Sequence, residues 1–259
     1  MAQQELARTN LEKLRQTAPQ WYPVAAYLDR KGFPLYRNTQ LHYLPTGEAY
    51  LDDMLTVLDT AQRFIFVEYF IMAEGQIWDR LSEILCRKSR QGVEVKLIFD
   101  DFGSMMRMPN EKVEELQDAG VEVKVFNPVH HYVNRLYFNY RDHRKITCVD
   151  GDVAYTGGAN IADEYANLIE RFGYWKDCGV RLEGEGAWGL TREFLQMWER
   201  MGGGVQHEYD YYRPLHHPAA QGFCQTVVDG PDDNPNNAAE DLFLQLISRA
   251  RHTVYITTP

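Results

Sequence analysis

The chain has 259 residues, a formal net charge of −10, 44% hydrophobic residues and 25% charged residues. These fractions are typical of a globular protein and exclude a disordered chain, and the length suits one large domain or two ordinary ones. The acidic balance excludes a general attraction for nucleic acid or for an anionic membrane, so any basic site must be local.

Predicted strands alternate with predicted helices along most of the chain. Runs of β-branched and aromatic residues predict strands at 41–44, 64–72, 93–101, 121–126, 145–150, 153–158 and 178–184. Apolar residues at helical spacing predict helices at 47–58, 77–92, 111–120 and 188–198, after a helical segment at 1–33. This alternation predicts an α/β fold with a mainly parallel, mixed sheet flanked by helices.

The pattern restarts near the C-terminus. "LTVLDTAQRFIFVEY" (55–69) and "LQLISRARHTVYITT" (244–258) match in their apolar positions after a constant shift, which indicates a repeated unit. The alternative is that one amphipathic helix followed by a strand resembles any other. We expect a helical segment, a first repeated unit, a connector and the beginning of a truncated second unit, at 1–33, 34–201, 202–221 and 222–259.

The stretch "DHRKITCVDGDVAYTGGAN" (142–160) groups residues that are able to do chemistry. His143 and Lys145 are two positions apart, so in an extended strand they share a face. Asp150 follows five residues later, and Gly157 and Gly158 let the backbone approach a ligand before Asn160. An imidazole, an ammonium group and an amide at one point suit a phosphodiester, although "HRK" alone also fits a solvated basic turn.

This pattern, H-x-K-x4-D followed by G-G-x-N, resembles the HKD motif of the phospholipase D superfamily, in which G-S-x-N is usual. The G-G-x-N form, with "YRDHRK", "ADEY" and "RFGYWKD", resembles the bacterial cardiolipin synthases. "VEYFIMAEGQIWDRLSEIL" and "GVEVKLIFDDFGS" add to the resemblance, which runs from about Tyr27 to Pro259. It implies a phospholipase D-like fold built from two repeated units.

The resemblance also implies roles for individual residues. His143 is one of two active-site histidines, as nucleophile or as general acid and base, and Lys145 and Asn160 bind phosphate oxygens. Asp177 orients a histidine across the site, unless it forms only a strand-edge salt bridge. Asp150 belongs to the motif and is counted with the catalytic residues, although its role in the superfamily is mainly structural.

Two further residues are expected to bind substrate together with Lys145 and Asn160. Glu68 lies at the end of a predicted strand, where it can line the pocket, and Arg141 lies just before the motif. We expect neither a metal ion nor a cofactor. The adjacent histidines His130–His131 and His216–His217 point opposite ways in extended chain, the four cysteines are scattered, and no nucleotide-binding glycine motif is present.

The implied reaction transfers a phosphatidyl group between two phosphatidylglycerol molecules through a phosphohistidine, giving cardiolipin and glycerol. The chain contains one HKD motif, so it is expected to carry one of two half-sites. The second half comes from downstream sequence or from a second chain. The alternatives are another HKD phosphodiesterase, namely a phospholipase D or a nuclease, or an inactive fragment. The acidic balance argues against a nuclease.

The expected partners are phosphatidylglycerol, other anionic phospholipids and the membrane surface, with no nucleic acid. Arginines and aromatic rings alternate in "YVNRLYFNYRDHRK" (132–145), which suits anionic headgroups unless the rings pack beneath the loop. No stretch reaches the roughly eighteen apolar residues of a membrane helix. We expect a place at the bacterial cell membrane, either peripheral or anchored by segments that are absent from this chain.

Overall fold

The computed structural model describes residues 2–129, 139–230 and 237–257, with the side chains of residues 2–5 left out. The chain divides into two compact units. The larger unit comprises residues 38–222, and the smaller unit combines residues 1–37 with residues 223–259. The HKD-like stretch lies in the larger unit.

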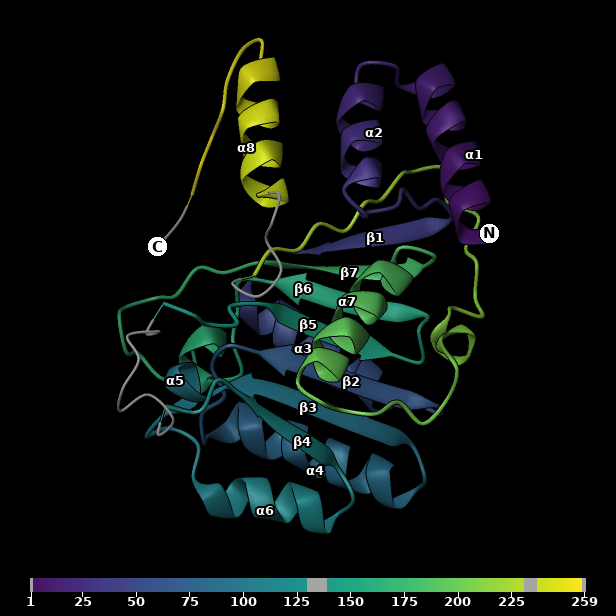
Figure 1. The fold of residues 1–259 in the computed structure, drawn as a ribbon. Helices are drawn as coiled ribbons and strands as arrows, with labels where there is room; N and C mark the ends of the chain where they lie inside the picture. The colour runs from purple at the N-terminus through teal and green to yellow at the C-terminus, as the bar shows by residue number, and fades with distance from the viewer. Residues whose placement is uncertain (1, 130–138, 231–236, 258–259) are drawn as a thin grey trace. The chain divides into compact units, whose positions relative to one another are not determined.

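A single mixed sheet organises the described part of the larger unit (Figure 1). Its seven strands follow the order β1-β7-β6-β5-β2-β3-β4. They are β1 (Thr39–Leu44), β2 (Phe64–Tyr69), β3 (Glu94–Asp100), β4 (Glu122–Phe126), β5 (Lys145–Val149), β6 (Val153–Gly157) and β7 (Gly179–Gly184). The predicted α/β class and mixed sheet are therefore confirmed.

Parallel pairing is confined to one half of this sheet. β2, β3 and β4 pair in parallel, whereas β5, β6, β7 and β1 pair antiparallel with their neighbours. The prediction of a mainly parallel sheet is wrong for this second half. Parallel neighbours need a long crossover, usually a helix, but β5 and β6 are joined by residues 150–152 alone, which suffice only for a hairpin.

Helices cover both faces of the sheet (Figure 1). One face packs against α3 (Gly47–Leu58), α4 (Gln76–Arg90) and α6 (Asn110–Asp118), through a hydrophobic core that includes Leu51, Leu81 and Leu97. The other face packs against α7 (Ala187–Arg200), where the Phe66 and Phe194 rings stack with their centroids 4.7 Å apart. The short helices are α5 (Asp101–Ser104), η2 (Asp163–Ala166) and η3 (Tyr209–Tyr212).

The smaller unit contains three helices in its described part: α1 (Ala2–Thr17), α2 (Tyr22–Arg30) and α8 (Ala238–Arg249). Leu11 and Leu14 of α1 pack against Ala25 of α2, and the hydroxyl of Tyr27 donates a hydrogen bond to Asp241 of α8. The repeat at 244–258 predicts a strand after α8, but residues 254–257 are exposed and belong to no ladder. β-branched composition alone does not make a strand without a neighbouring strand to pair with.

Candidate active site

His143 and Lys145 meet at the edge of the sheet where β5 begins. Lys145 is the first residue of β5 and lies opposite Tyr69, the last residue of β2. Its ammonium nitrogen donates to the carbonyl oxygen of His143 at 2.7 Å and lies 3.2 Å from His143 Nδ1. The ring of Phe70 covers both side chains, with its centroid 4.8 Å from that of His143 and 5.6 Å from Lys145 Nζ. The structure thus brings the imidazole and the ammonium group together.

Burial lowers the pKa of both groups. It lowers the pKa of Lys145 to about 8, and the nearby carboxylates of Asp142 and Asp177 oppose part of that shift. Burial also lowers the pKa of His143, the charge of Lys145 lowers it further, and Asp142 acts in the opposite direction. A neutral imidazole therefore lies beside an ammonium group that loses its proton more easily than an ordinary lysine. A neutral imidazole next to a cation suits nucleophilic attack on a bound anion.

Asn160 lies after β6 and Asp177 lies before β7, at the end of the sheet where β5 begins. Asn160 is buried after β6, and its side-chain oxygen accepts a hydrogen bond from the backbone N–H of Ile71 at 3.0 Å. Asp177 precedes β7 and accepts from Trp175 Nε1 at 3.1 Å and from the N–H of Cys178 at 2.8 Å. Both residues therefore stand at the edge that carries His143 and Lys145.

Gly157 and Gly158 allow the backbone after β6 to lie close to Asp177 and Cys178. A Cβ atom on Gly158 would lie 2.3 Å from Asp177 Oδ1, and one on Gly157 would lie 2.7 Å from the carbonyl oxygen of Cys178. Contacts this short do not occur, so the carboxylate of Asp177 occupies the space that a side chain at position 158 would need. This packing accounts for G-G-x-N in place of G-S-x-N.

The structure does not bring Asp150, which was expected among the catalytic residues, together with His143 and Lys145. Asp150 follows the last residue of β5, at the opposite end of the strand from Lys145. Its carboxylate accepts hydrogen bonds from the backbone N–H groups of Gln62, Arg63 and Phe64, at 2.8, 2.7 and 2.9 Å. Asp150 therefore fixes the start of β2, which is a structural role.

Glu68, which was expected to bind substrate, is not brought to His143 and Lys145 either. It is fully buried and precedes Tyr69, the residue paired with Lys145, so it points to the opposite face of the sheet. There its Oε1 lies 3.1 Å from Arg144 Nε. Strand alternation places Glu68 beneath the α7 face and away from His143.

A buried charge cluster flanks His143 in sequence. Arg144 Nε lies 3.2 Å from Asp142 Oδ1, and Asp142 is buried beside Glu68. Burial raises the pKa of Glu68 well above its ordinary value, Arg144 opposes the shift, and the charge and hydrogen bond of Asp142 add to it. Burial therefore favours the neutral form of Glu68 beside the Arg144–Asp142 ion pair. Sequence reasoning missed this cluster, although Asp142 and Arg144 in "DHRK" are two residues apart and so can share a face of extended chain.

Arg141, the other expected substrate-binding residue, is engaged within the protein. Its Nη1 donates to the carbonyl oxygen of Asn127 at 3.0 Å and lies 3.4 Å from Asp100 Oδ1. Its guanidinium carbon lies 5.0 Å from the centre of the Phe102 ring. These contacts tie the residues before His143 to the end of β3.

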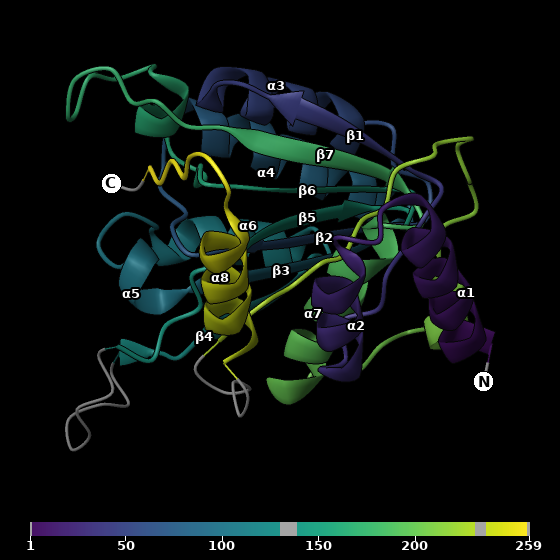
Figure 2. The ribbon, with the colours of Figure 1, turned by 90° about the horizontal axis from the view of Figure 1, so that it is seen from above.

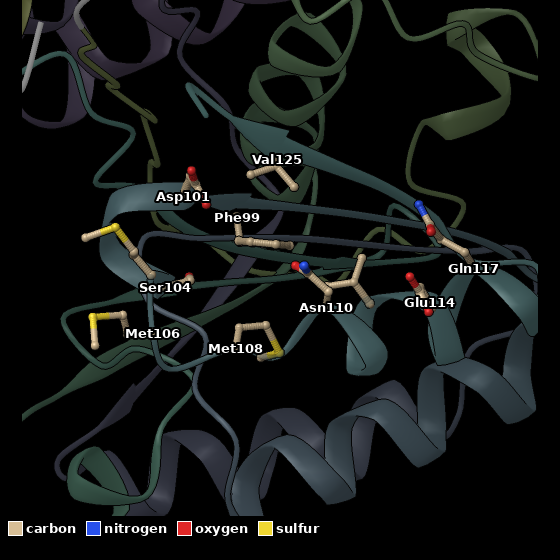
Figure 3. A pocket seen from close by; sticks show the side chains of 11 residues that line it. Phe99, Asp101, Ser104, Met106, Met108, Asn110, Glu114, Gln117 and Val125 are labelled. Atoms are coloured by element: carbon tan, nitrogen blue, oxygen red, sulfur yellow. The ribbon is translucent and has the colours of Figure 1, made fainter. Parts of the chain in front are cut away.

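A pocket of about 400 Å³ lies between β3, α5 and α6 (Figure 3). Phe99 of β3 forms its floor and is paired with Tyr69, which places the pocket two strands away from Lys145. Figure 3 shows Met106 and Met108 around one part of the pocket and Glu114 around another. Ser104, which lines the pocket, donates through its Oγ to the carbonyl oxygen of Phe70 at 3.4 Å.

The remaining expectations concern the adjacent histidines, metal ions and membrane helices. His130, His131 and Arg135 lie outside the described residues. Within residues 2–129, 139–230 and 237–257, no three or more His, Cys, Asp and Glu side chains are grouped to hold a metal ion. In the same part of the chain, no helix combines the length and apolar character needed to cross a bilayer.

The mixed sheet with helices on both faces, and the His-x-Lys pair at its edge, define a phospholipase D-like protein. Residues 54–198 match the family described as "Cardiolipin synthase, PLD-like domain", and the chain belongs to this family. Phosphatidylserine synthase of Haemophilus influenzae has a similar fold, with a TM-score of 0.50 and 14% identity over 73% of this chain and 46% of that one.

Curated relatives cover nearly all of the chain. A protein of Streptococcus mutans called "Uncharacterized protein" is 40% identical over 96% of this chain and 54% of its own length. A "Cardiolipin synthase" of Geobacillus kaustophilus is 34% identical over 93% of this chain and 48% of its own length. A "Cardiolipin synthase 2" of Bacillus anthracis is 35% identical, over 86% and 43%. The chain spans about half the length of the curated relatives it matches.

Proposed function

We propose that the chain carries one half-site of a cardiolipin synthase, which transfers a phosphatidyl group from one phosphatidylglycerol to another. The observation that carries this proposal is the 3.2 Å approach of Lys145 Nζ to His143 Nδ1 at a sheet edge that Asn160 and Asp177 share. Curated relatives called cardiolipin synthase support the choice of substrate. Association with the bacterial membrane surface is part of the same proposal.

In the first step, the imidazole of His143 forms a bond to phosphorus and the bond from phosphorus to the glycerol oxygen breaks. A partner acid gives its proton to the departing alkoxide. In the second step, a hydroxyl of the acceptor phosphatidylglycerol attacks phosphorus, the partner takes its proton, and the bond to the imidazole breaks. The ammonium group of Lys145 and the amide of Asn160 stabilise the phosphate oxygens throughout.

The partner acid has to lie across the phosphate from His143, because attack and departure occur on opposite sides of phosphorus. The described residues place no second His-x-Lys pair at this edge. We therefore assign the partner to a second half-site, in the remainder of a longer protein or in a second copy of the chain. If the roles are reversed, His143 is the acid and base and the partner is the nucleophile.

Product analysis of the natural full-length protein tests the proposed reaction. The protein is incubated with phosphatidylglycerol in vesicles, and mass spectrometry follows cardiolipin, glycerol and phosphatidic acid. The proposal predicts cardiolipin and glycerol in equal amounts. Phosphatidic acid as the main product would identify a hydrolase instead, since water would then be the acceptor. Cleavage of nucleic acid without lipid turnover would identify a nuclease.

A further inference from the structure

Two exposed apolar loops border the edge that carries His143. The first comprises residues 102–107, after β3, and the second comprises residues 168–174, between η2 and β7. Figures 1 and 2 both place α5 and the segment before β7 at the same end of the sheet. We call these two loops together the site-edge surface. Its exposed apolar side chains are Phe102, Met105, Met106, Leu168, Ile169, Phe172 and Tyr174.

The second loop is held in place at its base, so its exposed tip is a built feature. The side-chain amide of Asn167 donates to the carbonyl oxygen of Trp175 at 2.9 Å and accepts from the N–H of Trp175 at 2.7 Å. The indole of Trp175 packs on Tyr165, with ring centroids 5.4 Å apart, and donates to Asp177. The fold thus anchors this loop to a site residue and still leaves Phe172 68% exposed.

Glu164 of η2 joins the two loops. This buried carboxylate lies 2.7 Å from an Arg107 guanidinium nitrogen of the first loop and 3.1 Å from Arg171 Nη1 of the second. One carboxylate therefore faces two guanidinium groups. Lys176 adds a further exposed cation beside the second loop, and Glu170 adds one exposed anion. The two loops together with Glu164 and Lys176 thus carry three cations, Arg107, Arg171 and Lys176, and two anions, Glu164 and Glu170.

This arrangement matches the layers of a membrane interface. Apolar side chains at the loop tips suit the boundary of the acyl region, and cations just behind them suit anionic headgroups. The apolar residues form one group around the site, and a grouped apolar patch marks an interaction surface more often than scattered residues do. The Met106 side chain is 96% exposed. Only contact with a lipid phase or with another molecule would remove it from water.

We infer that the site-edge surface docks on a bilayer containing anionic phospholipid, with Met105, Met106, Ile169 and Phe172 entering the interfacial layer. This inference rests on the proposed function for its choice of a lipid bilayer as the partner, since a site that transfers lipid has to open toward its substrate. It adds the orientation of the larger unit on the bilayer. Met105 and Met106 also line the pocket beside β3, so the pocket opens toward the same lipid phase.

Vesicle flotation of the full chain tests the docking surface. We compare phosphatidylcholine vesicles with and without phosphatidylglycerol, using Ile169→Ser/Phe172→Ser and Met105→Ser/Met106→Ser. Each pair is expected to weaken binding to the anionic vesicles about tenfold or more, because removing apolar area from an interface costs affinity in proportion. Added salt is expected to weaken the wild-type chain further through loss of the headgroup attraction.

Leu215→Ser is the matched control. Leu215 is 71% exposed and its N–H donates to Asp152 in the turn between β5 and β6, at the far end of the sheet. Its substitution is expected to change vesicle binding by less than about twofold, since surface changes away from a site have small effects. Phe172→Trp adds a gain of signal: its fluorescence is expected to shift to the blue on anionic vesicles and to be quenched by brominated acyl chains.

Three results would overturn the inference. They are unchanged vesicle binding in both serine pairs, an equal loss in Leu215→Ser, and no quenching of Trp at position 172. If the pairs instead change the molecular mass of the chain in lipid-free light scattering, the surface belongs to a protein interface. Vesicle binding and the proposed reaction can be tested independently. His143→Ala is expected to bind vesicles as well as the wild-type chain does, even though it should not catalyse transfer.

Discussion

Lys145 and His143 form a compact unit: the lysine ammonium donates to the histidine carbonyl oxygen at 2.7 Å and lies 3.2 Å from Nδ1 of its ring. The hydrogen bond fixes the backbone just before β5, and the ammonium charge favours the neutral imidazole. The same cation is then available to a phosphate oxygen. One lysine can thus position the histidine, lower its pKa and bind the anion.

Binding of an anion should weaken as the pH rises through about 8, because burial lowers the pKa of Lys145 to that value. Lys145→Arg keeps its charge across this range and should remove the dependence. Titration calorimetry with inorganic phosphate between neutral and alkaline pH checks the prediction. Equal weakening in both proteins would show that another group controls the anion site.

Stability should respond to the same titration with the opposite sign. The unfolded lysine keeps its proton up to about its ordinary pKa of 10.5, whereas the folded one releases it near 8. Between these values the unfolded state binds more protons, so the free energy of unfolding rises with pH. Lys145→Met should remove that rise and stabilise the chain at neutral pH by on the order of 1 kcal/mol. Urea unfolding at several pH values measures both effects.

Asp150→Ala should destabilise the larger unit by about 2 to 4 kcal/mol, because three backbone N–H groups at the start of β2 lose their acceptor. Asp150→Asn keeps one acceptor oxygen and tolerates the left-handed φ of 55°, so its cost should be smaller. Urea unfolding gives both values. A loss of turnover without a loss of stability would return Asp150 to the catalytic residues.

Gly158→Ala should displace the carboxylate of Asp177, since its Cβ would lie 2.3 Å from Oδ1. Such overpacking costs about 1 to 3 kcal/mol. In an Asp177→Gly background the same change should cost much less, because the obstructing carboxylate is gone. A double-mutant cycle measures this coupling. If the two substitutions changed the free energy of unfolding additively, the contact with Asp177 would not be the reason for glycine at position 158.

Glu68→Gln should be tolerated within about 1 kcal/mol, because burial favours the neutral form of Glu68 and glutamine is a neutral side chain of the same size. Glu68→Ala should cost more, about 1 to 3 kcal/mol, because it deprives buried Arg144 of its contact with Glu68. Raising the pKa of Glu68 adds stability that is lost as the pH rises through the raised value, and the glutamine variant should lack that loss. Thermal unfolding across the pH range tests both statements.

Short-range geometry made the centre of the site predictable. His143 and Lys145 are two residues apart, so strand alternation alone places both on one face. The same reasoning could have excluded Asp150: five residues of extended chain at about 3.3 Å each put it far from Lys145. The short link between the strands at 145–150 and 153–158 likewise indicated a hairpin, and with it the antiparallel half of the sheet.

Other features depend on pairing between segments that are distant in sequence. The face of Glu68 follows from the register of β2 against β5, which brings Tyr69 opposite Lys145. A shift of one residue would have put Glu68 on the face of the site. The bridge from Glu164 to Arg107 and Arg171 likewise joins loops that only the folded sheet brings to one end. No local pattern contains that information.

The most direct test of the central claim is the effect of His143→Ala on cardiolipin formation by the natural full-length protein. His216→Ala is the control, because that exposed histidine lies by Asp152 at the far end of the sheet. Loss of a nucleophile or of an acid and base should slow transfer by about 10² to 10⁴ or more while leaving thermal unfolding unchanged. The account predicts near-background turnover for His143→Ala and wild-type turnover for His216→Ala. A folded His143→Ala protein that keeps a substantial part of its cardiolipin synthesis would contradict it.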